Sequence, residues 1–311
     1  MNKLERVDAA LMGDNLDRLP FSFWYHFGLQ HAQPEALAQA HLSFFHTYDL
    51  DFLKVMNDYP YPMSDNQNMF LDIADWKKLK IFSGDEEGFG EQLKALRIIA
   101  RELSKEAYFV ETIFSPWTIA RKLSSIQTVL ALKEKEPELF LDVMHKIALS
   151  LANYARQAIL AGAAGIFLSL SAATNSIMTY SEYEKFCRPF DLIVLDAIKN
   201  QTKFNILHIH GKEIFFDELL DYPVQAINWS HTLSRPTLTQ ARTKYKGCLL
   251  GGIGEERFGH NTVSTIEQEV KQTIESMGNK HLIITPGCSI QTDSAPKLLH
   301  AVKRAVLQNK T

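Results

Sequence analysis

Leu207-His208-Ile209-His210-Gly211 ends an apolar run that begins at Phe204, and it has the pattern of a buried β-strand stopped by a glycine. Successive side chains of a strand alternate between its two faces, so His208 and His210 point the same way. Two imidazoles on one face at the end of a strand can bind one cation. The alternative is a chance repeat of two packed histidines.

A cysteine follows a second apolar run in the same manner. Cys288 lies in Thr285-Pro286-Gly287-Cys288-Ser289, directly after residues 282–284. Nitrogen and sulfur donors suit zinc, and three protein ligands leave a fourth position open for chemistry. We therefore predict a Zn²⁺ site formed by His208, His210 and Cys288. A lone buried cysteine that serves only packing is the alternative.

Apolar runs and helical patterns alternate along the whole chain. The runs are 21–25, 50–56, 108–114, 165–170, 204–210, 226–229, 248–252 and 282–284. Such alternation predicts a parallel sheet, and eight units in about 300 residues favour a closed barrel. We expect an α/β fold, a (βα)8 TIM-type barrel, in a single domain over residues 1–311. The runner-up is an open doubly wound sheet, which the lack of G-x-G-x-x-G after the first run disfavours.

Two helix starts are also expected from the sequence. Residues 3–13 carry one apolar stripe, typical of an N-terminal helical extension before the barrel. Ser181 has the features of a helix N-cap, with Glu184 three residues later completing a capping box.

Several polar residues follow the expected strands, where the active face of such a barrel lies. Asp58 could act as a general base or hold a metal-bound histidine, and a plain turn aspartate is the alternative. His26 could shuttle a proton or be a structural histidine. Ser171 also stands at a strand end.

Three further residues could contact a cofactor or ligand. Trp117 and Tyr59 could floor a pocket for a planar ligand, or pack in the core or at its rim. Gly252 could let a ligand approach the backbone, or relieve crowding at the barrel rim.

Composition limits the class of protein. The 311 residues carry a formal charge of −3, with 46% hydrophobic and 22% charged residues, which is typical of a soluble globular protein. The chain has neither a long apolar span nor an apolar signal core at its start, so we expect no membrane partner and a cytoplasmic location. The three cysteines form no disulfide framework, and the charge balance argues against a nucleic-acid partner.

Over nearly its whole length the sequence resembles the uroporphyrinogen decarboxylase superfamily. The resemblance rests on an ordered set of motifs. They are Ser115-Pro116-Trp117-Thr118, Ala161-Gly162-Ala163, Leu207-His208-Ile209-His210-Gly211, Ile227-Asn228-Trp229, Gly251-Gly252-Ile253 and Pro286-Gly287-Cys288-Ser289. The resemblance implies a (βα)8 barrel with its pocket at the strand ends.

The resemblance implies one of two activities. Decarboxylases of the superfamily use no metal and bind a tetrapyrrole through an arginine pair and an aspartate, but residues 23–31 contain no arginine. Asp58 matches that aspartate, and Ser171 the substrate-contacting serine, only by position. The methyltransferase branch uses zinc in a His-x-Cys and distant Cys pattern. His208 and Cys288 fall on the outer ligands, and His210 replaces the middle cysteine.

The resemblance therefore favours a zinc-dependent methyltransferase that moves a methyl group between a corrinoid protein and a thiol or similar acceptor. It implies a small-molecule substrate and a corrinoid on a partner protein, and it leaves a homodimer open. Uroporphyrinogen decarboxylation within tetrapyrrole biosynthesis is the first alternative. A ligand-binding barrel without catalysis is the second.

Overall fold

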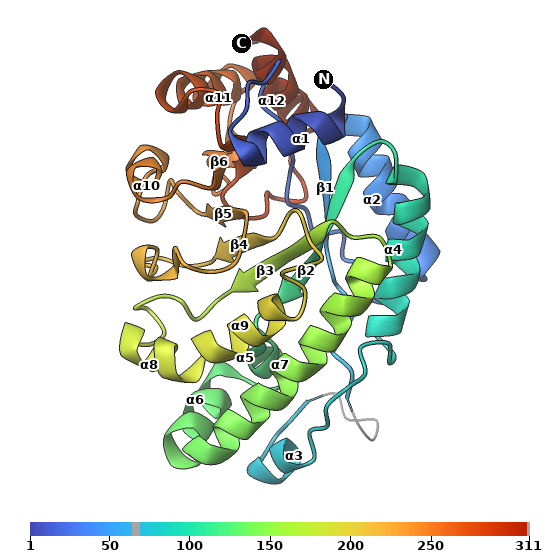
Figure 1. Ribbon diagram of the computed structural model, residues 1–311, viewed down its shortest axis with the longest axis vertical. Helices are drawn as coiled ribbons and strands as arrows, with labels where there is room; N and C mark the ends of the chain where they lie inside the picture. The colour runs from blue at the N-terminus through green and yellow to red at the C-terminus, as the bar shows by residue number, and fades with distance from the viewer. Residues whose placement is uncertain (64–68, 310–311) are drawn as a thin grey trace.

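The computed structural model describes residues 1–63 and 69–309, and Figure 1 shows their arrangement. Its described part contains one curled sheet of seven parallel strands, each hydrogen-bonded to the next in chain order. The strands are β1 (Phe52–Val55), β2 (Tyr108–Phe114), β3 (Gly165–Leu170), β4 (Ile206–Ile209), β5 (Ala226–Trp229), β6 (Cys248–Ile253) and β7 (Leu282–Pro286). The strands are buried almost throughout, as expected where helices cover a parallel sheet.

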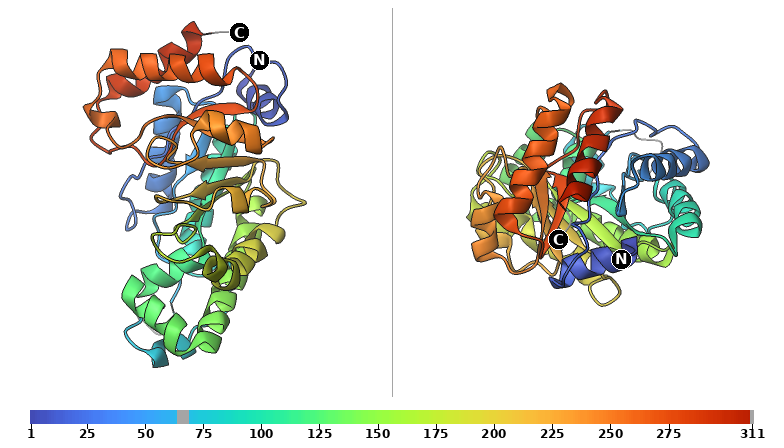
Figure 2. Two further views of the ribbon diagram at one scale, coloured as in Figure 1. Left: turned by 90° about the vertical axis from the view of Figure 1, so that its left-hand side faces the viewer. Right: turned by 90° about the horizontal axis from the view of Figure 1, so that it is seen from above.

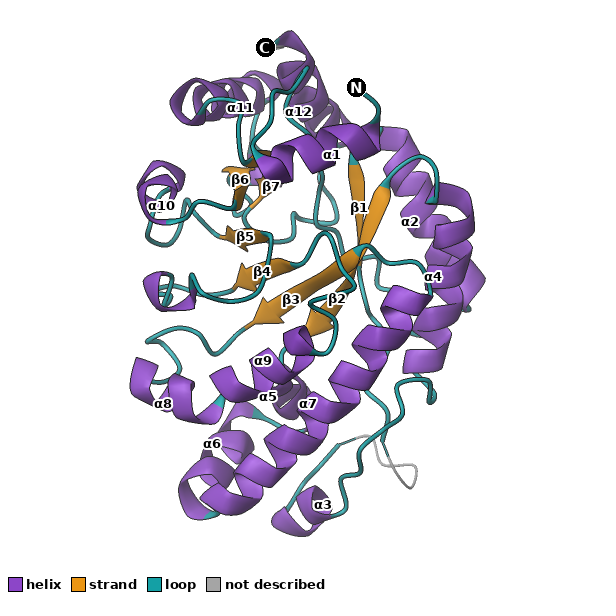
Figure 3. Ribbon diagram, in the orientation of Figure 1, coloured by secondary structure: helices purple, strands orange, loops and turns teal. Residues whose placement is uncertain are grey.

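Helices follow most strands and lie outside the sheet (Figures 1 and 3). They are α1 (Lys3–Met12), α2 (Pro34–Tyr48), α3 (Ile73–Lys77), α4 (Phe89–Leu103), α5 (Pro116–Leu123), α6 (Ile126–Lys135), α7 (Pro137–Leu160), α8 (Tyr180–Phe186), α9 (Arg188–Asp196), α10 (Leu238–Lys244), α11 (Val263–Met277) and α12 (Pro296–Gln308). Helix α2 packs against β1, while α4 and α7 pack against β2. Helices α1 and α12 lie at one end of the molecule, and α3 and α6 at the other (Figure 2).

The expected strand at residues 21–25 is reduced to a single bridge. Phe21 pairs in parallel with Ile284 of β7, and its carbonyl accepts a hydrogen bond from the Asp51 amide at 3.0 Å. The Phe21 amide donates to the Asp51 carboxylate at 2.9 Å, so this amide cannot form the backbone hydrogen bond that a regular strand would need. The prediction of eight regular strands is therefore wrong here, and the regular sheet is a seven-stranded half-barrel.

Buried ion pairs hold the N-terminal helix against this segment. The carboxylate of Asp51 accepts from Arg6 of α1 at 2.8 Å and from Arg18 at 2.7 Å. Asp51 is fully buried, so both arginines and the Phe21 amide are needed to replace its lost hydration. The expected helical extension is thus docked onto the sheet as α1.

The N-cap of helix α8 is Thr179, two residues before the predicted N-cap at Ser181. The Thr179 hydroxyl accepts from the Glu182 amide at 3.3 Å, and the Glu182 carboxylate accepts from the Thr179 amide at 3.0 Å. The predicted start at Ser181 is wrong, because the sequence holds two overlapping capping boxes. Glu182 also pairs with Lys133 of α6 at 2.5 Å, which favours the earlier box.

Among the described residues, the helices are all too short or too polar to cross a bilayer. The buried apolar side chains of the described residues form one connected cluster around the sheet. The carboxyl ends of the parallel strands all meet at one edge of the sheet, and the candidate residues lie along that edge.

Candidate metal centre

The predicted metal ligands lie together at the carboxyl edge of the sheet. His208 is on β4, His210 directly follows this strand, and Cys288 follows β7. One ligand atom from each residue lies within 4.8 Å of the other two. Cys288 Sγ is 3.8 Å from His210 Nδ1. The curled sheet brings these strand ends together, so the group can bind one metal ion.

A buried amide fixes the orientation of His208. The Asn228 amide nitrogen donates to the carbonyls of Leu250 and Pro286, each at 3.0 Å. Its oxygen accepts from the Trp24 indole at 3.2 Å and faces His208 Nδ1 at 2.7 Å. Because that oxygen can only accept, His208 Nδ1 carries the proton and Nε2 keeps its lone pair. This arrangement is typical of a metal-ligating histidine.

Burial sets the protonation of the three candidate ligands. Burial, followed by the charges of His210 and Lys54, lowers the pKa of His208 to about 3, although its hydrogen bond with Asn228 raises the pKa. Burial, followed by the charge of Arg121, lowers the pKa of His210 below its usual value. Burial raises the pKa of the Cys288 thiol. At neutral pH both imidazoles are therefore neutral, and the cysteine must release a proton when it binds a metal.

A cavity of about 200 Å³ opens in front of these three residues. The lining includes two cations that the sequence analysis missed, Lys54 of β1 and Arg121 of α5. Lys54 is buried, its ammonium is 2.8 Å from Met56 Sδ, and burial lowers its pKa to about 8. The signal for Lys54 was a single lysine inside an apolar strand. The cavity therefore combines metal donors with positive charge.

His26 and Asp58 are joined at the rim of the cavity. His26 Nδ1 lies 3.3 Å from Asp58 Oδ1, and His26 lines the metal cavity. Burial raises the pKa of Asp58, but the hydrogen bond and charge of His26, followed by the charge of Lys54, lower it below its usual value. Asp58 itself lines a neighbouring cavity. The structure thus brings these two predicted residues together beside the candidate metal ligands.

Two further predicted residues, Ser171 and Trp117, differ in whether they line the metal cavity. The Ser171 hydroxyl is 2.7 Å from that of Thr118, and Ser171 lines the metal cavity. Trp117 is 1% exposed and packs edge-on against Phe140, so most of its ring belongs to the core. Both residues also line a small cavity beside His210.

The other two predicted ligand contacts lie apart from the metal centre. The Tyr59 hydroxyl donates to the Ala32 carbonyl at 2.8 Å, and the residue lines the neighbouring cavity. Gly252 has a φ of +103°, and a side chain there would meet Thr273 of α11 at 2.8 Å. Its amide donates to His231 at 3.2 Å. Gly252 therefore allows close packing of α11 on β6 and does not line the metal cavity.

Comparisons with known proteins agree with this architecture. The family model described as uroporphyrinogen decarboxylase (URO-D) matches residues 55–308. A uroporphyrinogen decarboxylase of Trichodesmium erythraeum is 25% identical over 209 residues, which cover 62% of this chain and 55% of that protein. The matched region of this chain thus spans little more than half the length of that relative.

Solved structures show the same fold at low sequence identity. A methyltransferase from Methanosarcina mazei superposes with a TM-score of 0.80 at 16% identity, covering 99% of both chains. A B12-independent methionine synthase from Shewanella sp. W3-18-1 gives a TM-score of 0.51 at 11% identity, covering 70% of this chain and 66% of that one. Because the family match spans most of the sequence, the chain belongs to the uroporphyrinogen decarboxylase (URO-D) family.

Proposed function

We propose that this chain is a zinc-dependent methyltransferase that moves a methyl group between a corrinoid protein and a thiol or similar acceptor. One observation carries the proposal. His208, His210 and Cys288 present three donor atoms within 4.8 Å of one another at the carboxyl edge of the sheet. We also read the curled sheet as a (βα)8 barrel in which the segment around Phe21 replaces one strand.

The donor atoms fit a zinc ion. The Asn228 side-chain oxygen accepts a hydrogen bond from the protonated Nδ1 of His208, which leaves the lone pair of Nε2 available for a metal. His210 is neutral at pH 7, because burial lowers its pKa. Nitrogen and sulfur ligands suit Zn²⁺, and three protein ligands would leave one position for a small molecule in the cavity. When bound, the ion would lower the pKa of a thiol in the cavity.

The remaining residues of the cavity prepare it for an anionic sulfur. Burial raises the pKa of the Cys288 thiol, and the ammonium of the buried Lys54 offsets a small part of that rise through its positive charge. The His26–Asp58 pair at the rim can accept the proton that an incoming thiol releases. Ser171 and Thr118 offer hydroxyl groups to a bound small molecule. The corrinoid would come from a partner protein at the strand ends.

The experiment is a methyl-transfer assay with free methylcobalamin and 2-mercaptoethanol. Loss of the methyl–cobalt absorbance should require zinc, stop on addition of a chelator, and return when zinc is restored. His210→Ala should abolish turnover, whereas His46→Ala, which changes an exposed histidine on α2, should leave it unchanged. Zinc-independent turnover, or equal rates in both variants, would refute the proposal.

A second candidate is decarboxylation of uroporphyrinogen. The names of the curated relatives favour it, among them the Trichodesmium enzyme at 25% identity. Asp58 would then be the central residue, because its carboxylate lines a cavity at the carboxyl edge of the sheet. Incubation with uroporphyrinogen distinguishes the two proposals, since only a decarboxylase would form coproporphyrinogen without zinc.

A further inference from the structure

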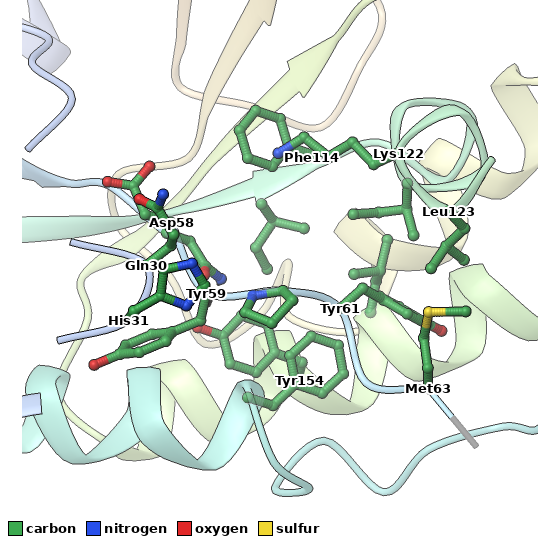
Figure 4. A pocket seen from close by; sticks show the side chains of 16 residues that line it. Gln30, His31, Asp58, Tyr59, Tyr61, Met63, Phe114, Lys122, Leu123 and Tyr154 are labelled. Atoms are coloured by element: carbon green, nitrogen blue, oxygen red, sulfur yellow. Dashed lines mark hydrogen bonds between the residues drawn. The ribbon is translucent and has the colours of Figure 1, made fainter. Parts of the chain in front are cut away.

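A second cavity of about 290 Å³ lies next to the metal cavity. Apolar and aromatic side chains make most of its wall; among them are Phe89 of α4, Ile113 of β2, Leu123 of α5, and Leu151 and Tyr154 of α7. Figure 4 shows Phe114 and Lys122 on one side of this cavity, with Tyr61 and Tyr154 across from them. A cavity with such walls favours an apolar or aromatic ligand.

The two cavities are adjoining parts of one region. Phe114, at the end of β2, lines both of them. The hydrogen bond between His26 and Asp58 is a second link between the two cavities, because His26 lines the metal cavity and Asp58 lines the apolar cavity. A molecule whose reactive atom is at the metal centre can therefore place its body beside Phe114.

Lys122 supplies a positive charge to the apolar cavity. Its ammonium is 3.4 Å from the centroid of the Phe114 ring. Within residues 1–63 and 69–309, this ammonium has a ring as its partner and no carboxylate at ion-pair distance. Asp58 lines the same cavity, but its nearer partner is His26 at 3.3 Å. In the described part of the chain no salt bridge occupies the Lys122 ammonium, so it can pair with an anionic group of a ligand.

We propose that this cavity binds an aromatic carboxylate, with the ring against the apolar wall and the carboxylate at Lys122. This proposal rests on the proposed function in one respect, because the aromatic carboxylate is taken to be the part of the methyl acceptor that carries its thiol. Its thiol would reach past Phe114 to the metal cavity. The cavity is large enough for a substituted ring or two fused rings.

Calorimetric titration of the metal-free full chain with 2-naphthoate tests the cavity alone. We expect one binding site, and at least a tenfold loss of affinity in Lys122→Met. The neutral probe 2-naphthamide should bind both proteins equally, because it lacks the anionic group. Lys185→Met is the matched control, since the ammonium of this exposed lysine also stands over a ring, that of Phe186.

Two results would overturn the assignment. One is no binding of 2-naphthoate by the wild type at millimolar concentration. The other is equal affinity of the wild type and Lys122→Met for 2-naphthoate. Ile119→Trp fills the cavity from α5 and should remove binding of both probes, with thermal unfolding used to check that the variant is folded.

The methyl-transfer assay then connects the cavity to the reaction. With zinc present, 3-(4-mercaptophenyl)propionate should have a higher kcat/KM than 2-mercaptoethanol, and Lys122→Met should raise its KM without changing kcat. If 2-naphthoate binds but no thiol is methylated, the proposed function fails and the binding site stands. If 2-mercaptoethanol is methylated but 2-naphthoate does not bind, the function stands and this inference fails.

Discussion

Replacing Asn228 by alanine should weaken zinc binding without removing any metal ligand. The amide oxygen of Asn228 accepts a hydrogen bond from His208 Nδ1 at 2.7 Å. Loss of this hydrogen bond leaves the imidazole free to rotate and to change tautomer. Loss of such a partner costs about 10- to 100-fold in metal affinity. That range corresponds to about 1.4 to 2.7 kcal/mol of binding free energy.

The same substitution should also destabilise the fold. It leaves the Trp24 indole and the carbonyls of Leu250 and Pro286 buried without their partner. An unsatisfied buried polar group costs about 1–3 kcal/mol, so we expect a loss of at least about 2 kcal/mol in the free energy of unfolding. Both effects must be measured, because a general loss of stability could be mistaken for a loss of metal binding.

The matched control is Asn205→Ala. Asn205 is another buried asparagine, whose side chain accepts from the Ile166 amide at 3.0 Å and donates to Thr202 at 2.8 Å. It precedes β4 and stands away from the metal centre. Zinc titration against a competing chelator, at a temperature where each variant is folded, should weaken only in Asn228→Ala. Wild-type affinity in Asn228→Ala, or an equal loss in Asn205→Ala, would refute the role assigned to Asn228.

Three further outcomes are expected. Cys288→Ser should weaken zinc binding far more than Cys187→Ser or Cys248→Ser in the same titration, because the latter two thiols are buried in packing; equal losses would contradict this. Metal-free protein should lose stability as the pH falls below about 6.5, because burial lowers the folded pKa of His41 and of His231 to about 4. Between these pH values the unfolded state binds more protons, so denaturant unfolding should show a loss of up to about 1.4 kcal/mol per pH unit for each imidazole, and a flat profile would contradict the assignment. Uroporphyrinogen should not be converted to coproporphyrinogen at a useful rate, because the segment 23–31 offers no arginine for its carboxylates; robust product formation would favour the decarboxylase.

The proximity of His208, His210 and Cys288 could be predicted because the strand pattern and the residue types agreed. His208 and His210 alternate with apolar residues, and Cys288 follows another apolar run. Parallel strands bring their carboxyl ends to one edge, so separation along the chain does not prevent the three from meeting. The resemblance to the family supported the same residues and the same fold.

Other parts of the site depend on contacts that no local pattern encodes. Asn228 stands inside an apolar strand, which marks it as unusual, but the five hydrogen-bond partners of its side chain come from distant parts of the chain. The cavity beside Lys122 is formed by several helices and loops, so its shape follows only from their packing. Likewise, the loss of a regular strand at Phe21 depends on the carboxylate of Asp51. The N-cap of α8 is Thr179 and not Ser181, because Glu182 also pairs with a lysine of another helix.

The central claim is that His208, His210 and Cys288 bind zinc, and X-ray absorption of the zinc-loaded protein tests it most directly. The claim predicts one tightly bound zinc per chain, with nitrogen neighbours at about 2.0–2.1 Å and one sulfur at about 2.3 Å. In Cys288→Ser the sulfur signal should disappear, and in His210→Ala the affinity for zinc should fall. A wild-type spectrum without sulfur, or zinc binding no tighter than that of His210→Ala, would contradict the claim.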